Sequence, residues 1–263
     1  MVSYTYDFMV KLKYITTIVV ALVISPCSMY GIWEPGYQLK YQERLNTHGR
    51  ASPGLNDLRT SVEEWLTGSW CSKERGKMLM DAVFIFQPRT TVEVGVFAGA
   101  SLVPLALAVR QAKCGTVYAF DAWDPKTAAQ YMEPSNPTHE WWSTLDMDSV
   151  HDQCIRSLSR WNLDDCVRVI RGASAKVSGQ VAGPIDLLHL DGDFTEKGSL
   201  EDVDTYLPKL RVGGCLVVNN AFVKIGEKLT KAKCVQKILD CCELIGSADH
   251  DNALFFIKTG ESG

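Results

Sequence analysis

Two glycines and one aspartate stand at a spacing that suits a polar ligand. Gly95 and Gly99 follow a β-rich apolar run over 90–94 and precede a helical apolar pattern. Glycine permits positive φ and the close approach of a ligand, and the next helix offers unpaired N–H groups. Asp121 ends the following apolar run, about 20 residues past the turn, as ribose-binding carboxylates do. We therefore expect a nucleoside here without a pyrophosphate, because the spacing is not G-x-G-x-x-G; an ordinary strand-to-helix turn is the alternative.

Alternating strands and helices are expected to position this turn. Short apolar runs predict seven strands at 90–94, 116–121, 167–170, 185–190, 215–218, 242–245 and 253–258. Continuous apolar strands that alternate with helices are typical of a parallel sheet covered on both faces. The predicted fold is α/β, a doubly wound, Rossmann-like sheet of seven mostly parallel strands with an antiparallel edge.

Helical patterns fill the intervals between these strands. They predict helices at 57–67, 72–86, from 102 onward, 139–161, 199–210 and 227–239. The helix at 199–210 begins with a capping-box pattern from Ser199 to Asp202. A polar and aromatic insertion over 123–142 lies where a substrate lid belongs, or else packs the next helix onto the sheet. Its aromatic and imidazole side chains are Trp123, Tyr131, His139, Trp141 and Trp142.

Composition favours one globular domain. The chain has 263 residues, 46% of them hydrophobic, and a formal net charge of -4. This charge and the absence of a long basic run argue against nucleic acid as a partner. The nine cysteines are scattered without zinc spacing, which favours reduced thiols.

The N-terminus has the pattern of a signal peptide or a membrane anchor over residues 1–33. Lys11 and Lys13 precede a run without charges. Residues 34–54 are interpreted as a linker and 55–263 as the folded domain. We expect membrane association through this segment with the domain facing the cytosol; export after signal cleavage is the alternative.

Five motifs occur in a fixed order over about 90–220. They are VEVGVFAGAS, VYAFDAWD, VRVIRGAS, IDLLHLDGD and LPKLRVGGCLVVNN. The ordered set resembles the class I S-adenosylmethionine-dependent methyltransferases, and most of all the small-molecule O-methyltransferases of the catechol and macrocin type. The resemblance implies S-adenosylmethionine as cofactor and methyl transfer to a hydroxyl of a small-molecule acceptor.

The resemblance also assigns residues to the cofactor. Those at the glycine turn, around the methionine part, are Glu93, Gly95, Phe97, Gly99 and Ser101. Asp121 takes the two ribose hydroxyls, which suits its two acceptor oxygens. The loop on the adenine side contains Gly172, Ala173 and Ser174, and a helix N-cap is the alternative role for Ser174.

The catalytic end departs from the metal-dependent relatives. Asp191 matches their first magnesium ligand, but Asn219 and Asn220 stand where they have an acidic residue and its neighbour. Amide oxygens can bind a hard cation, yet losing a carboxylate removes charge that magnesium sites use, so a strong metal site is not expected. Asp191 has a structural or orienting role as its alternative.

The base of these relatives is missing, because position 194 is Phe. Asp193, Glu196 and Lys197 are the candidates to replace it, with a slight preference for Asp193. His189 is interpreted as a core residue of a buried strand.

Two other functions are alternatives to methylation of a small-molecule hydroxyl. One is a catalytically inactive domain that still binds S-adenosylmethionine or a related nucleoside. The other is methylation of nucleic acid or amino groups, which the acidic balance disfavours. Homodimerisation is left open.

Overall fold

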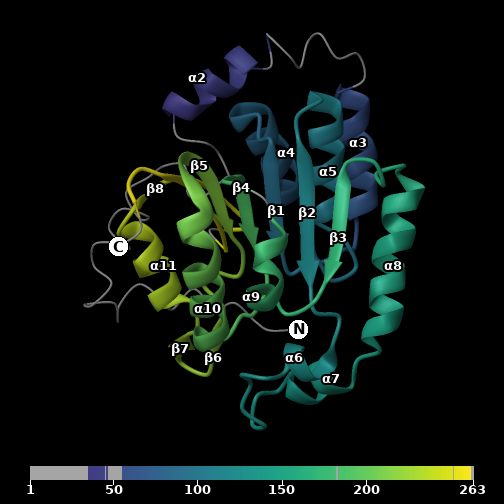
Figure 1. Cartoon of the computed structure of the whole chain (residues 1–263), viewed down its shortest axis with the longest axis vertical. Helices are drawn as coiled ribbons and strands as arrows, with labels where there is room; N and C mark the ends of the chain where they lie inside the picture. Colours follow the sequence, from purple (N-terminus) through teal and green to yellow (C-terminus); the bar gives the residue numbers. More distant parts are fainter. Residues whose placement is uncertain (1–34, 45, 47–54, 182, 251, 262–263) are drawn as a thin grey trace.

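The computed structural model describes residues 35–44, 46, 55–181, 183–250 and 252–261 (Figure 1). The stretch 1–33, expected to be a signal or an anchor, lies outside these residues. None of the helices described is both long enough and apolar enough to cross a bilayer.

A seven-stranded sheet forms the centre of the described chain. Its strands follow the order β3-β2-β1-β4-β5-β9-β8, with β1 to β5 parallel and β9 antiparallel to both of its neighbours. The strands are β1 Thr90–Val94, β2 Thr116–Asp121, β3 Val167–Arg171, β4 Ile185–Leu190, β5 Leu210–Val218, β8 Cys242–Ala248 and β9 Ala253–Lys258. This order and direction confirm the predicted doubly wound α/β sheet.

Helices cover both faces of the sheet (Figure 1). The α-helices of the described chain are α2 Pro35–Arg44, α3 Leu55–Leu66, α4 Lys73–Phe86, α5 Leu102–Ala112, α6 Pro125–Ala128, α7 His139–Thr144, α8 Met147–Arg160, α9 Ser174–Val177, α10 Glu196–Tyr206 and α11 Ala232–Leu239, of which α6 and α7 lie beyond the carboxyl ends of the strands. Two apolar cores result, one under α3, α4, α5 and α8 and the other under α10 and α11. The neighbours Leu187 and Leu188 on β4 belong to different cores, which explains why this strand is apolar except at Asp186 and His189.

Two predicted helix boundaries are wrong. The helix expected over 139–161 is divided, because Leu145 is extended and Asp146 accepts the N–H of Ser149 at 3.1 Å to start α8. The predicted Ser199 cap lies inside α10, which begins after Thr195. Asp202 does not cap this helix, because it is buried on its inner side.

The last predicted helix is shorter than expected. Part of the interval 227–239 forms a two-stranded hairpin, β6 Lys224–Ile225 and β7 Lys228–Leu229, before α11 begins at Ala232. Gly226 has a φ of 62° in the turn of this hairpin. The local turn residue therefore prevails over the helical pattern.

The stretch interpreted as a linker, 34–54, contains the helix α2. The ring of Tyr37 on α2 stacks against Phe86 at the end of α4, with 6.2 Å between the ring centroids. At least this part of the stretch therefore packs on the domain.

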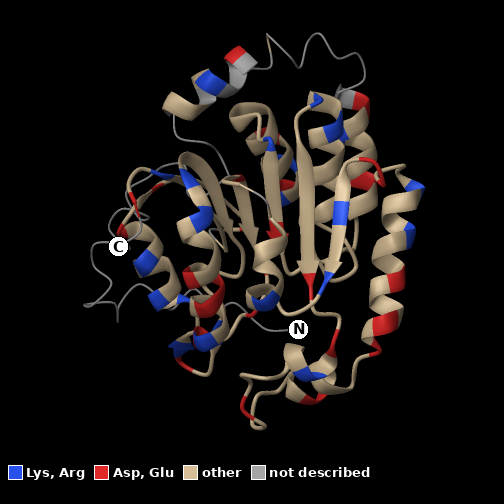
Figure 2. Cartoon of the chain, in the orientation of Figure 1, with Lys and Arg blue, Asp and Glu red and all other residues tan. Residues whose placement is uncertain are grey.

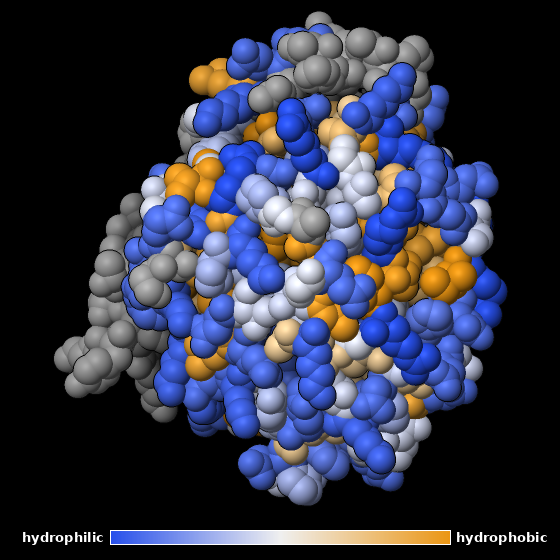
Figure 3. All heavy atoms as spheres, viewed as in Figure 1, coloured by the Kyte–Doolittle hydropathy of each residue, from blue (hydrophilic) through white to orange (hydrophobic). Residues whose placement is uncertain are grey.

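Charged side chains of both signs are interspersed over the described elements (Figure 2). The face shown in Figure 3 is mostly polar, with apolar residues in separate groups between the charged ones. Neither one sign of charge nor one apolar patch covers most of this face, so its surface alone does not indicate a binding site.

Candidate active site

A cleft of about 1760 Å³ opens at the carboxyl ends of β1, β2, β4 and β5. Its walls come from the glycine turn after β1, the insertion after β2 and the loops after β3, β4 and β5. Open parallel sheets bind ligands at this edge, where helices lead away on opposite faces. Sites for one small ligand have volumes of about 300 to 1,000 Å³, so this cleft can hold two such molecules.

The glycine turn has the conformation that the sequence predicts. Gly95 and Gly99 have φ of 85° and 86°. A Cβ at Gly95 would lie 2.2 Å from the carbonyl oxygen of Asp191, so glycine is required there by space as well as by φ. A Cβ at Gly99 would meet the Sγ of Cys154 at 3.4 Å, so φ alone requires glycine. Gly95 and Phe97 line the cleft.

Asp121 stands at the end of β2 and fixes the glycine turn. Its Oδ2 accepts the N–H groups of Val96 and Phe97, both at 2.9 Å, and its Oδ1 accepts that of Trp123 at 2.8 Å. Burial raises the pKa of Asp121, and these N–H donors oppose the shift. A carboxylate has about four acceptor positions, so capacity for a hydroxyl remains on the side that lines the cleft.

Glu93 lies one layer below the cleft and does not line it. Its Oε1 accepts the hydroxyl of Ser101 at 2.5 Å, and the Nδ1 of His189 lies 3.3 Å from the same oxygen without hydrogen-bond geometry. Glu93 and His189 are fully buried, in agreement with the interpretation of His189 as a core residue. Ser101 does line the cleft, so Glu93 acts on the site through Ser101.

The loop after β3 contributes the wall beside Asp121, because the backbone N–H of Gly172 donates to the carbonyl of Asp121 at 2.8 Å. Ala173 and Ser174 line the cleft. Gly172 precedes them, and a Cβ at this position would lie 2.5 Å from a methyl group of Val177. Ser174 is the first residue of α9 and not its cap. Its hydroxyl donates to Oδ1 of the buried Asp202 at 2.5 Å, which holds this loop against α10.

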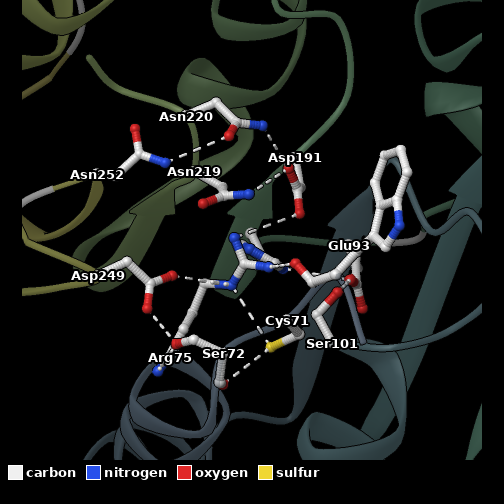
Figure 4. A network of polar contacts seen from close by, with 12 residues as sticks. Cys71, Ser72, Arg75, Glu93, Ser101, Asp191, Asn219, Asn220, Asp249 and Asn252 are labelled. Atoms are coloured by element: carbon white, nitrogen blue, oxygen red, sulfur yellow. Dashed lines mark hydrogen bonds and ion pairs between the residues drawn. The ribbon is translucent and has the colours of Figure 1, made fainter. Parts of the chain in front are cut away.

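The polar end of the cleft joins the loops after β4 and β5. Oδ1 of Asp191 accepts the side-chain amides of Asn219 at 2.7 Å and Asn220 at 3.3 Å (Figure 4). Its Oδ2 faces Nη1 of Arg75 at 3.9 Å. The three predicted ligands therefore converge, but their donor set does not fit a resident magnesium ion. The single carboxylate already faces two amide N–H donors and a permanent cation, and no group of three or more acidic, His or Cys residues gathers elsewhere among the described residues.

Asp193 is the candidate base that lines the cleft. Its Oδ1 accepts the N–H of Thr195 at 2.6 Å, and burial raises its pKa against this bond. A Cβ at Gly198 would lie 2.2 Å from the carboxyl group of Asp193, so this glycine makes the room for it. Glu196 pairs with Lys228 and Lys233 away from the cleft.

Aromatic rings form the mouth of the cleft. Trp70 stacks on Phe97 at 4.9 Å and on Trp141 at 5.5 Å between ring centroids, and Trp142 meets Phe97 edge-on at 5.9 Å. Trp70 and Trp141 are 63% and 42% exposed, so part of each side chain is accessible from solvent. Trp123, in contrast, is fully buried and packs the insertion onto the core, which is the alternative interpretation for this residue.

Sequence reasoning missed two residues of the cleft, Trp70 and Arg75. Arg75 is 4% exposed and lies with Met78, Leu79 and Ala82 on the buried side of α4. A cation on the apolar stripe of a predicted helix is a signal that could have found it, because a buried charge needs a partner. Trp70 stands outside any predicted element, and the sequence offers no comparable signal for it.

Residues 92–221 match a family model described as a methyltransferase domain. The solved O-methyltransferase NovP aligns with a TM-score of 0.56 at 19% identity, over 72% of this chain and 81% of that one. TomG from Streptomyces achromogenes, an O-methyltransferase of tomaymycin synthesis in complex with S-adenosylmethionine, aligns at 0.53 and 15% identity over 93% and 96%. PaMTH1, a methyltransferase from Podospora anserina bound to S-adenosylhomocysteine, aligns at 0.52 and 12% identity over 98% and 100%. These likenesses show a shared fold.

Proposed function

Because residues 92–221 form a class I, S-adenosylmethionine-dependent methyltransferase domain, we propose that the chain methylates a hydroxyl group of a planar small molecule. The observation that carries the proposal is the placement of three features in one cleft. Asp121 lies on its nucleoside side, the group around Asp191 lies at its polar end, and aromatic rings line its mouth. The cleft is large enough for a cofactor and an acceptor together.

The cofactor side of the cleft fits a nucleoside. Asp121 keeps acceptor capacity for a ribose hydroxyl, and Ala173 and Ser174 form the wall beside it. Gly95 and Phe97 bring backbone close to the remainder of the ligand. When bound, S-adenosylmethionine supplies an activated methyl group, so the chain has to align the acceptor and remove its proton.

Aromatic walls favour a planar acceptor. The exposed rings of Trp70 and Trp141 can stack on a flat molecule, since offset or parallel ring contacts are favourable. Phe194, whose ring lies 6.2 Å from that of Trp142, continues the apolar wall toward Asp191. Several solved proteins of this fold carry O-methyltransferase in their names, including TomG, which acts in tomaymycin synthesis, and a putative caffeoyl-CoA O-methyltransferase from Staphylococcus aureus.

Asp193 is the base that we favour. Burial raises the pKa of its carboxyl group and so makes the carboxylate a stronger proton acceptor. Asp191 is less suited, because its carboxylate already accepts the amides of Asn219 and Asn220 and faces the cation of Arg75. We propose that Asp191 helps to orient the acceptor.

A paired acceptor screen tests the proposal. The full chain is incubated with methyl-labelled S-adenosylmethionine and matched pairs of planar phenols and the corresponding anilines, and products are identified by mass spectrometry. We expect label on phenolic oxygen, a loss on the order of 100-fold with Asp193→Asn, and a weaker KM for planar acceptors with Trp141→Ala. Label on the anilines alone, or on none of the compounds although S-adenosylhomocysteine binds, would contradict hydroxyl methylation.

A further inference from the structure

Arg75 is a buried cation at the polar end of the cleft. Its Nη2 donates to the carbonyl of Trp70 at 2.6 Å, and its Nε to Sγ of Cys71 at 3.5 Å. Two carboxylates lie near the guanidinium, with Nη1 3.9 Å from Asp191 and Nε 3.8 Å from Asp249 (Figure 4). Both distances exceed a hydrogen bond, so the charge is compensated while Nη1 keeps its N–H groups for another acceptor.

The position of Arg75 is fixed by segments far apart in the chain. Ser72, which caps α4, hydrogen-bonds to Asp249 in the loop between β8 and β9. The backbone N–H of Asp249 donates to Glu74 at 2.7 Å. The first turn of α4 is therefore held against the end of the sheet, and Arg75 is held with it. Arg75 lies outside the residues 92–221 that match the family model.

We propose that Arg75, held beside Asp191, is the fixed cation of this active site and binds the acceptor oxygen in place of a divalent metal ion. This inference rests on the proposed function. An oxygen beside Nη1 accepts a hydrogen bond from the guanidinium and directs its own proton to the carboxylate of Asp193. As the oxygen–methyl bond forms, the methyl–sulfur bond breaks and its electron pair stays on sulfur. The hydroxyl proton passes to Asp193.

Arginine is suited to this task. Its guanidinium stays charged at any working pH and presents several donors in a fixed plane. A preorganised donor aimed at developing negative charge is worth most where water is excluded, and Arg75 is 4% exposed. The same charge beside Asp191 repels a divalent cation, and the uncharged side chains of Asn219 and Asn220 add no carboxylate to offset that repulsion.

The test combines metal binding, cofactor binding and turnover. We expect wild type to keep its turnover in EDTA and to bind Mn²⁺ weakly by electron paramagnetic resonance. Arg75→Gln should bind S-adenosylhomocysteine as wild type does, lose about 100-fold in turnover and bind Mn²⁺ about tenfold more tightly, because Asp191 loses its cation. Arg75→Lys, which keeps the charge but not the fork, should recover part of the turnover and bind Mn²⁺ weakly.

Arg59→Gln is the matched control. It removes an arginine that pairs with the buried Asp81 at 2.8 Å, away from the cleft, and should leave Mn²⁺ binding and turnover unchanged. Tight Mn²⁺ binding by wild type, or unchanged Mn²⁺ binding in an Arg75→Gln chain that still binds S-adenosylhomocysteine, overturns the inference. If Arg75→Gln does not fold, wild type and Arg75→Lys decide by the same Mn²⁺ titration. These binding results do not depend on finding an acceptor, so they separate this inference from the proposed function.

Discussion

Asp121 has two tasks at the cleft, because one carboxylate fixes the glycine turn and faces the ligand. We expect Asp121→Ala to weaken binding of S-adenosylhomocysteine about 10- to 100-fold. Hydrogen bonds to a charged group contribute roughly 1.5 to 3 kcal/mol, and the turn also loses its acceptor. Asp121→Asn should fall between wild type and Asp121→Ala, since it keeps one carbonyl oxygen.

Titration calorimetry measures this effect. Asp146→Ala is the control, because it removes the cap of α8 and does not line the cleft. An Asp121→Ala chain with the affinity of wild type would remove the main support for Asp121 as a ligand of the nucleoside.

Asp202 links the loop after β3 to the pH dependence of stability. Burial raises its pKa to about 6, against the hydrogen bond from Ser174. The folded chain thus binds this proton more tightly than the unfolded chain, so the contribution of Asp202 to the free energy of unfolding falls as pH rises from about 4 to about 6. The Asp202→Asn variant lacks this loss.

Urea denaturation at several pH values tests the sign. The difference in unfolding free energy, Asp202→Asn minus wild type, should increase by up to about 3 kcal/mol between pH 4 and 6 and stay level above pH 7. Asp204→Asn on the same helix removes an exposed partner of Lys237 and should show no such rise. Parallel curves for Asp202→Asn and wild type would mean that the pKa of Asp202 is not raised.

The glycine turn allows space and backbone conformation to be separated at the scale of one element. Gly95 and Gly99 share a φ near 85°, but only Gly95 faces backbone that a Cβ would overlap. Gly99→Ala should cost about 1 to 2 kcal/mol for a left-handed residue. Gly95→Ala should cost more than about 4 kcal/mol or leave no folded protein. Equal losses for the two variants in urea denaturation would show that the loop after β4 yields to a methyl group.

Strands were easier to predict than helix ends because burial on both faces leaves a continuous apolar run. Strand β4 could be predicted from its apolar residues. Leu187 and Leu188 point into different cores, which is why neighbouring positions are both apolar. Helix ends depend on single side chains with more than one partner available. Asp202 has the spacing of a capping residue but is buried against Ser174, and Asp146 starts a new helix within a helical pattern.

The candidate site likewise has one part that local sequence predicts and one part that it does not. Gly95 and Asp121 lie within one local motif and the next strand end, so their position at one cleft could be predicted from spacing alone, and their role in binding the cofactor stays a prediction. The polar end of the site is formed by segments far apart in the sequence. Ser72, the N-cap of α4, hydrogen-bonds to Asp249 in the loop after β8. Contacts of this separation follow from the sheet order and not from local pattern, so the partners of Arg75 could not be predicted, although its place on the apolar stripe of a helix marks it as a buried cation.

At the scale of the whole molecule, the N-terminal segment and the cleft place opposing demands on location. S-adenosylmethionine is made in the cytosol, and a charged zwitterion crosses a bilayer poorly without a carrier. We therefore propose that residues 1–33 anchor the chain with its domain in the cytosol, although a segment that follows Lys11 and Lys13 is also consistent with export.

Protease protection in sealed cells and vesicles tests this orientation. The domain should resist protease added outside intact cells and be digested after detergent. Digestion from outside, or a mature chain that begins near residue 29 in an exported fraction, would contradict it and make the proposed turnover doubtful.

The stacked rings at the mouth of the cleft give the protein an intrinsic spectroscopic signal for ligand binding. Trp70, Phe97 and Trp141 come from three separate segments, and two of these rings are indoles in parallel contact. Parallel indoles couple their electronic transitions, so their near-ultraviolet circular dichroism and emission depend on the angle and distance between them. A ligand that enters between these rings or draws the insertion inward changes that geometry, and acceptors can therefore be sought by spectroscopy on the unlabelled chain before any product is known.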